Sequence, residues 1–123
     1  MHRIKDLREF ISALDALGEL QEIDVETDPH LEIGAIIRRC YDLKAPAPLF
    51  NYIKGFERGF RVLGGSGGLS GKQGLGFSRI AVALGFPPDT DANTIVNTLS
   101  DSMTKKGIPP VTVKNGACQE NVF

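Results

Sequence analysis

Cysteine is scarce in this chain of 123 residues, and long apolar runs are absent. The two cysteines, Cys40 and Cys118, lie far apart and form no Cys-x-x-Cys pair, which indicates reduced thiols rather than a disulfide framework. No apolar run approaches the length of about 18 residues that a membrane-spanning helix needs. The first residues lead into an amphipathic pattern and not into the apolar core of a signal peptide. These absences predict a cytoplasmic protein.

An excess of positive charge is also missing. Lys and Arg number 14 against 15 Asp and Glu, so the chain as a whole lacks the basic footprint of a nucleic-acid-binding protein. Hydrophobic residues make up 41% of the chain, which is enough to build a core and argues against disorder. Glycine is the abundant residue, with 14 copies, nine of them between Gly55 and Gly76.

Apolar spacing and turn residues predict one α/β (α+β) domain, a small mixed sheet of three to four strands with about four packed helices. Helices are expected at 7–17, from Asp28-Pro29 to about residue 41, at 77–84, and from Thr90 or Asp91 to Gly107. Strands are expected at 20–25, 49–53, 60–63 and 109–113. The second helix is apolar over much of its circumference, so we expect it to be the most buried, with Cys40 in the core. In the first strand, Ile23 and Val25 should both face the core.

The glycine-rich loop 64–76 invites comparison with phosphate-binding loops, because it follows a strand and precedes a helix. Ser66 stands where a phosphate loop ending at Gly71-Lys72 needs its first glycine, and Gln73 stands where Ser or Thr would hold magnesium. The Gly-x-Gly-x-x-Gly pattern of dinucleotide-binding loops fails as well. Its third glycine is replaced by Ser70 when the pattern starts at Gly65, and by Arg79 when it starts at Gly74. The sequence therefore favours a flexible surface connection, with contact to an anion or cofactor as the alternative.

The remaining polar residues form no catalytic or metal-binding set. The acidic stretch from Glu19 to Glu32 lacks the glycine and glutamate of a calcium loop, and we interpret it as a solvated strand edge followed by a helix start. His2 and His30 have no neighbouring ligands at metal-binding spacing, and His30 is expected at the surface. No serine lies in a Gly-x-Ser-x-Gly context. We therefore assign no catalytic, cofactor-binding or metal-binding residue to this chain.

Several segments nevertheless resemble one enzyme family in order and spacing. Lys44–Asn51 (KAPAPLFN) and Phe60–Gly64 (FRVLG) resemble segments of the UbiD-type decarboxylases, as do PPVTV at 109–113 and GACQEN at 116–121. The opening fits too, with LREFI at 7–11, GEL at 18–20 and DPHLEI at 28–33. The departures are Ala117, where proline is usual, and the high glycine content after Gly64.

The resemblance implies a role in the non-oxidative, reversible decarboxylation of aromatic or α,β-unsaturated acids. Members of that family use prenylated FMN, a divalent metal, often manganese, and potassium, and their polypeptide is about four times as long as this one. Their catalytic and cofactor-binding residues lie beyond the matched part. The resemblance thus implies a non-catalytic N-terminal domain, residues 1–113, and an extended tail, residues 114–123, that leads to a cofactor-binding domain or subunit of an oligomeric enzyme. The alternative is a free-standing binding or assembly module that grips an anionic ligand with loop 64–76.

Overall fold

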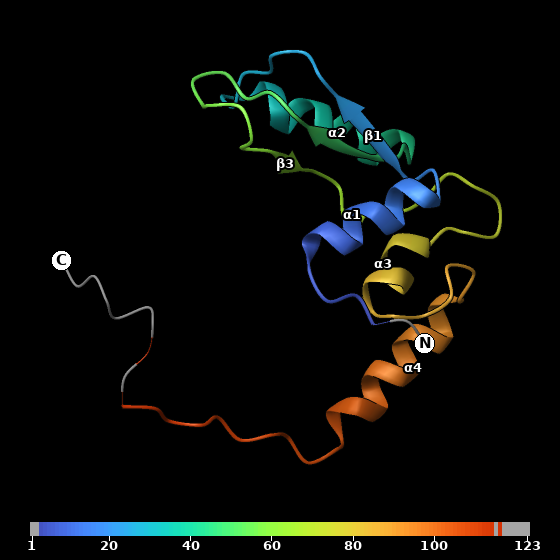
Figure 1. Ribbon diagram of the computed structural model, residues 1–123. Helices are drawn as coiled ribbons and strands as arrows, with labels where there is room; N and C mark the ends of the chain where they lie inside the picture. Colours follow the sequence, from blue (N-terminus) through green and yellow to red (C-terminus); the bar gives the residue numbers. More distant parts are fainter. Residues whose placement is uncertain (1–2, 115, 117–123) are drawn as a thin grey trace.

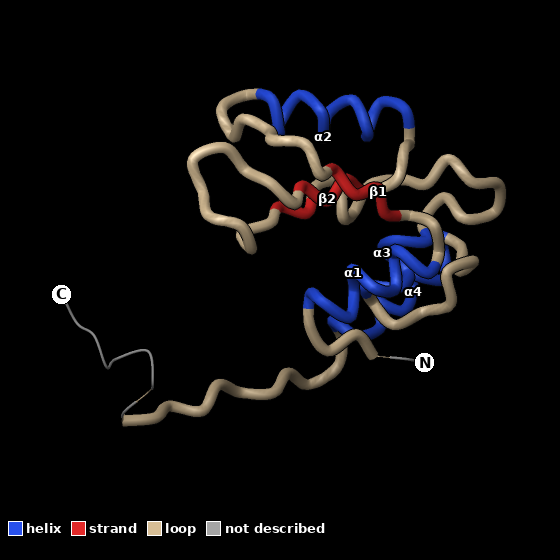
Figure 2. The backbone as a smooth tube through the Cα atoms, turned by 45° about the horizontal axis from the view of Figure 1, so that its top comes forward, coloured by secondary structure: helices blue, strands red, loops and turns tan. Residues whose placement is uncertain are grey.

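The polypeptide places a small sheet between two groups of helices in a computed structural model, which describes residues 3–114 and Gly116. Strand β1 (Leu20–Ile23) runs parallel to β2 (Ala47–Phe50), and β3 (Val62–Leu63) pairs antiparallel with β2, so the strand order is β1-β2-β3. Helix α2 (Glu32–Leu43) covers one face (Figure 1). Helices α1 (Leu7–Ala16), α3 (Ser78–Ala83) and α4 (Ala92–Met103) lie on the other side (Figure 2). The mixed three-stranded sheet and the four helices of the described residues confirm the predicted fold class.

The central strand β2 is buried on both faces, and its side chains point alternately into two separate parts of the core. Ala47 packs with Phe10 and Leu14 of α1 on one face. Phe50 packs with Ile33 of α2 and with Ile53 on the other. Because side chains alternate along a strand, one four-residue segment serves both halves of the core.

Helix α1 begins and ends where the sequence predicts. The carboxylate of Asp6 accepts a hydrogen bond from the Glu9 amide at 2.8 Å, which satisfies one of the free donors of the first turn. Gly18 follows the helix with φ of +63°, a left-handed conformation that glycine adopts without strain. The cap and the glycine thus fix the turn that delivers Glu19 to the start of β1.

Helix α2 differs from its prediction at the start and in burial. The Asp28 carboxylate accepts from the His30 amide at 2.8 Å, but Leu31, with φ of +69°, interrupts this turn, and the helix begins at Glu32. Ile33 is its one buried residue, and Cys40 is half-buried rather than core. The prediction of a deeply buried helix was wrong, because α2 packs on a single sheet face and its outer side meets solvent.

The strand predictions also need correction, since β2 covers Ala47–Phe50 rather than 49–53 and β3 covers Val62–Leu63 rather than 60–63. Strand β1 ends at Ile23, and Val25 is 69% exposed because the chain leaves the ladder before Thr27 bridges to Ile53. Residues 109–113 are extended but pair with no strand of the described chain, and Val111 is 86% exposed. This segment runs away from the sheet after α4 (Figure 1).

Candidate functional site

The glycine-rich loop surrounds a buried arginine. Arg79, on α3, is 2% exposed and donates from Nε to Glu19 Oε2 at 3.1 Å. Its terminal nitrogens donate to three carbonyl oxygens, of Gly65 at 2.8 Å, Leu69 at 2.8 Å and Ala45 at 2.6 Å. The other Glu19 oxygen accepts from the hydroxyl of Ser70 at 2.7 Å. We call Arg79, Glu19, Ser70 and these three carbonyls the Arg79 centre.

Glycine is required in the loop because the backbone approaches the guanidinium closely. A Cβ atom on Gly68 would lie 3.1 Å from an Arg79 terminal nitrogen and 3.0 Å from the Tyr41 ring. A Cβ on Gly64 would lie 2.4 Å from Ile37 on α2. By contrast, a Cβ on Gly67 would meet nothing within 4 Å. Part of the glycine excess is therefore explained by packing around a buried cation.

Three amides of the glycine-rich loop are already hydrogen-bonded within the fold. The amides of Gly68, Ser70 and Gly71 donate to backbone carbonyls of Gly65, Gly76 and Lys44. The carbonyls of Gly65 and Leu69 turn inward, toward the positive charge of Arg79. A loop that directs carbonyls to a cation is the electrostatic opposite of a phosphate loop, which directs amides to an anion. The Gly71 amide also ties the loop to Lys44 at the end of α2. The flexibility of the loop remains a prediction.

Lys72, which would be the lysine of a phosphate loop, instead contacts the end of α1. Its ammonium donates to the Leu17 carbonyl and, at 3.0 Å, to the Gly18 carbonyl at the end of α1. It also lies 3.6 Å from Glu19 Oε1. Lys72 therefore satisfies free carbonyls at the C-terminus of α1 and places a second positive charge near the Glu19 carboxylate.

The acidic residues between Glu19 and Glu32 lie in different environments. Glu22 and Asp24 are exposed at the strand edge as predicted, and both accept from Asn51 Nδ2 at 2.8 Å. Asp28 pairs with Lys54 at 2.9 Å, and this hydrogen bond, with that from the His30 amide, lowers the pKa of Asp28 below its ordinary value. Glu19 was wrongly assigned to the solvated edge, since it is 2% exposed and neutralised by Arg79.

The other candidate residues remain separate. His30 is exposed, as expected, whereas Ser70 and Ser78 are buried, and Ser70 belongs to the Arg79 centre. Cys118 and His2 lie outside the described residues. Among the residues described, no three His, Cys, Asp or Glu side chains gather as a metal site would require. None of the helices in this part of the chain has the length and apolarity to cross a membrane.

The chain is similar to proteins of one known family. The model of the 3-octaprenyl-4-hydroxybenzoate carboxy-lyase (UbiD) N-terminal domain matches residues 11–99. The chain belongs to the UbiD N-terminal domain family. It is 40% identical to the pyrrole-2-carboxylic acid decarboxylase of Pseudomonas aeruginosa over 118 residues, and 40% identical to ferulic acid decarboxylase 1 of Saccharomyces cerevisiae over 121 residues. Each alignment covers 96% of this chain and 24% of the relative.

Solved structures show the same relation. The vanillic acid decarboxylase of Sedimentibacter hydroxybenzoicus matches in its open form with a TM-score of 0.73 and 29% identity, covering 100% of this chain and 26% of that one. Its closed form also matches with a TM-score of 0.73. The chain thus spans about a quarter of the length of these UbiD-type decarboxylases.

Two of the segments that suggested the UbiD family, Lys44–Asn51 and Phe60–Gly64, contribute strands to the sheet. Lys44–Asn51 comprises the left-handed residue that ends α2, then β2 and Asn51. Phe60–Gly64 contains β3 and the glycine that packs against Ile37. These UbiD-like segments are therefore structural in this chain, and the Arg79 centre, which joins them to α1 and α3, was missed. The one signal for it was a charged residue, Arg79, among the apolar residues of the third predicted helix.

Proposed function

We propose that this chain acts as the N-terminal, non-catalytic domain of a UbiD-like enzyme that reversibly and non-oxidatively decarboxylates an aromatic or α,β-unsaturated carboxylic acid. The supporting observation is that 96% of the chain aligns at 40% identity with decarboxylases of which it forms about a quarter. The alternative of a free-standing module that binds an anion through loop 64–76 lacks comparable support, because that loop directs carbonyls to Arg79.

In this proposal the cofactors bind outside this domain, in a cofactor-binding domain or subunit of the same cytoplasmic, oligomeric enzyme. A phosphate and metal anchor for prenylated FMN, with manganese and potassium, needs several ligands that converge from rigid elements. The described residues do not fit this need, because no three His, Cys, Asp or Glu side chains among them gather in one place. Glu19 pairs with Arg79 and Asp28 with Lys54, and Glu22 and Asp24 accept hydrogen bonds from Asn51. We therefore derive no chemical step through the cofactor on this chain.

The domain's own task is to pack against the cofactor-binding part. Exposed apolar side chains are concentrated on α4 and on the extended segment after it: Val96, Leu99, Met103, Ile108, Val111 and Val113. Ile108 is 97% exposed, an arrangement that is costly for an apolar side chain in water and that packing would relieve. Residues 114–123 would continue from this segment to the cofactor-binding domain.

A chimeric enzyme tests the proposal. The matched quarter of the P. aeruginosa decarboxylase is replaced by this chain, and CO2 release from pyrrole-2-carboxylate is measured beside the same enzyme lacking that quarter. We expect the chimera to release CO2 and the shortened enzyme to be inactive. A chimera that folds and binds flavin but releases no CO2, or a shortened enzyme with full activity, would contradict the assigned role.

A further inference from the structure

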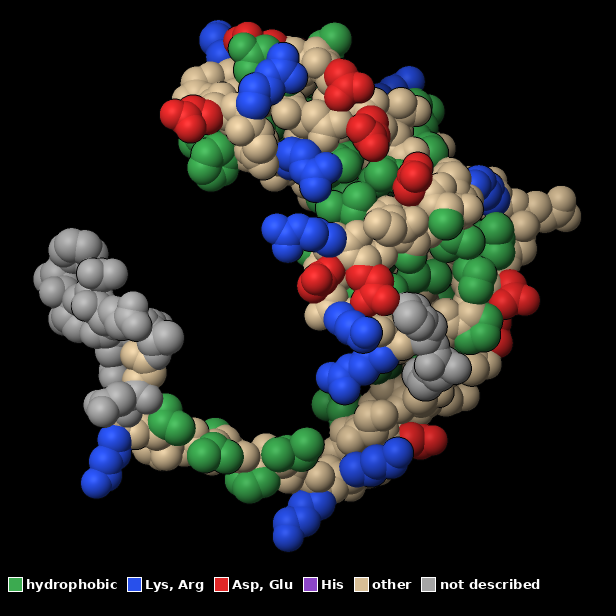
Figure 3. Space-filling view, viewed as in Figure 1, with side chains coloured by type: hydrophobic (Ala, Val, Ile, Leu, Met, Phe, Trp, Pro, Cys, Tyr) green, Lys and Arg blue, Asp and Glu red, His purple; other side chains and the backbone are tan. Residues whose placement is uncertain are grey.

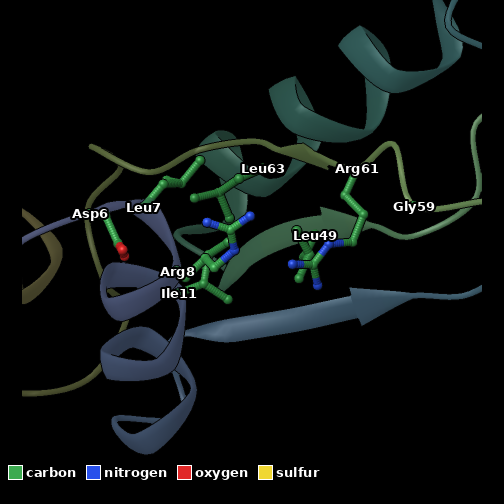
Figure 4. Close-up of a pocket in the computed structure, with 8 residues that line it drawn as sticks. All are labelled: Asp6, Leu7, Arg8, Ile11, Leu49, Gly59, Arg61 and Leu63. Carbon is green, nitrogen blue, oxygen red and sulfur yellow. The ribbon is translucent and has the colours of Figure 1, made fainter.

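A hollow of about 380 Å³ lies between α1 and the strands β2 and β3. Its apolar lining residues are Leu7, Ile11, Leu49 and Leu63, and its charged lining residues are Asp6, Arg8 and Arg61. Arg8 lies on α1, and Arg61 lies in the chain just before β3 (Figure 4). Both guanidinium groups extend into the space beside Leu49 and Leu63. In the space-filling view, basic side chains lie on both sides of the notch between α1 and β3 (Figure 3).

Neither guanidinium is neutralised within the described part of the chain. Ion pairs there involve Arg38, Lys54, Lys72 and Arg79, but not Arg8 or Arg61. Asp6, the carboxylate among the lining residues, accepts a hydrogen bond from the Glu9 amide at the start of α1 and points away from both arginines (Figure 4). Both arginines are exposed residues, and an anion held between them could accept charge-assisted hydrogen bonds from both guanidinium groups.

The apolar surface selects the kind of anion. Leu49 is 1% exposed and closes the floor of the hollow from within the sheet, whereas Leu7 and Leu63 leave apolar surface accessible to a ligand. Guanidinium groups match the planar, two-oxygen geometry of a carboxylate, and an apolar surface favours a ligand that carries its charge on a hydrocarbon body. The volume falls within the range of about 300–1,000 Å³ that is typical of small-molecule sites.

We propose that this hollow, the Arg8–Arg61 site, binds a small organic carboxylate, with the carboxylate held by the two arginines and an apolar or aromatic body against Leu7, Ile11 and Leu63. The site lies apart from the Arg79 centre, and the inference does not depend on the decarboxylase assignment, because its test is read on this chain alone.

The test is a titration of the purified chain with benzoate at low ionic strength, followed by chemical shifts of backbone amides. Acetate and inorganic phosphate serve as ligands that lack the aromatic body. Arg8→Gln and Arg61→Gln each remove one guanidinium charge while keeping a polar side chain. Arg38→Gln is the matched control, because Arg38 is an exposed arginine on α2 that is absent from the hollow. Thermal melting verifies that all three variants fold.

We expect saturable benzoate binding with shifts at Ile11 and Leu63, and dissociation constants raised about tenfold by Arg8→Gln or Arg61→Gln, as the loss of a charge-assisted hydrogen bond predicts. Arg38→Gln should leave binding unchanged, and acetate and phosphate should bind more weakly than benzoate. The inference would be overturned by absence of saturation at millimolar benzoate, by equal weakening in Arg38→Gln, or by phosphate binding as tight as that of benzoate.

Discussion

Arg79 and Glu19, 60 residues apart in the sequence, form an ion pair of 3.1 Å in which each side chain is 2% exposed. The pair joins the turn after α1 to α3, and the carbonyls that complete it come from the α2–β2 connection and the glycine-rich loop. Buried ion pairs are costly to desolvate, so their value depends on complete hydrogen bonding, which the Arg79 centre supplies.

Arg79→Met should destabilise the domain strongly, because it leaves the Glu19 carboxylate buried without its cation. Loss of one partner of a buried pair costs about 3–5 kcal/mol. The free energy of unfolding in urea is the measurement. Replacing both residues, with Glu19→Leu added to Arg79→Met, should recover part of the loss, because no charge then remains buried.

Arg38→Met is the matched control for this measurement. Arg38 pairs with Asp42 at 3.0 Å, but its side chain is 79% exposed, and surface pairs of this kind contribute about 0–1 kcal/mol. If Arg79→Met changed the unfolding free energy no more than Arg38→Met does, the Arg79 centre would not hold the fold together.

Gly68→Ala should destabilise the domain and Gly67→Ala should not, although the two residues are neighbours. The new methyl group on residue 68 would press on Arg79 and Tyr41, and overpacking of this kind costs about 1–3 kcal/mol. At residue 67 the methyl group meets open space, and the loss of backbone freedom in the unfolded chain should stabilise by up to about 1 kcal/mol. The free energy of unfolding in urea is measured for both variants. Equal effects of the two substitutions would indicate a freely mobile loop and would contradict the packing role of Gly68.

Acidification should weaken the link between the β1–α2 connection and Lys54. The hydrogen bond from Lys54 and that from the His30 amide lower the pKa of Asp28 below its ordinary value of 3.8. A carboxyl with a lowered folded-state pKa stabilises the fold above its unfolded pKa, and this contribution disappears as the pH falls through the folded-state pKa. Carboxyl NMR titration should show the Asp28 midpoint move upward in Lys54→Met. An unmoved midpoint would show that Lys54 does not hold Asp28 in solution.

Local signals predicted much of the fold. Asp6, Gly18 and Asp91 act on their own helix ends, so the bounds of α1 and the start of α4 followed from neighbouring residues. The mixed sheet followed from short apolar segments between turn residues. The limited burial of α2 could not be predicted from the sequence. Apolar residues around a helix show which surface it could bury, but not how many other elements pack against it.

The Arg79 centre could not be predicted from local patterns. Glu19 lies in an acidic stretch that is otherwise exposed, and its partner lies beyond a loop whose glycines suggested flexibility. The Arg8–Arg61 site likewise joins α1 to β3 across the sheet, so only the fold brings its two arginines together.

We propose that this chain supports a decarboxylase whose cofactor is bound elsewhere in the enzyme. The most direct measurement is a flavin-fluorescence titration of the isolated chain with FMN and with prenylated FMN in the presence of manganese, beside the chimeric decarboxylase described above. We predict saturable flavin binding by the chimera and none by the isolated chain. Saturable binding by the isolated chain at micromolar flavin would contradict the claim and assign the cofactor site to this domain.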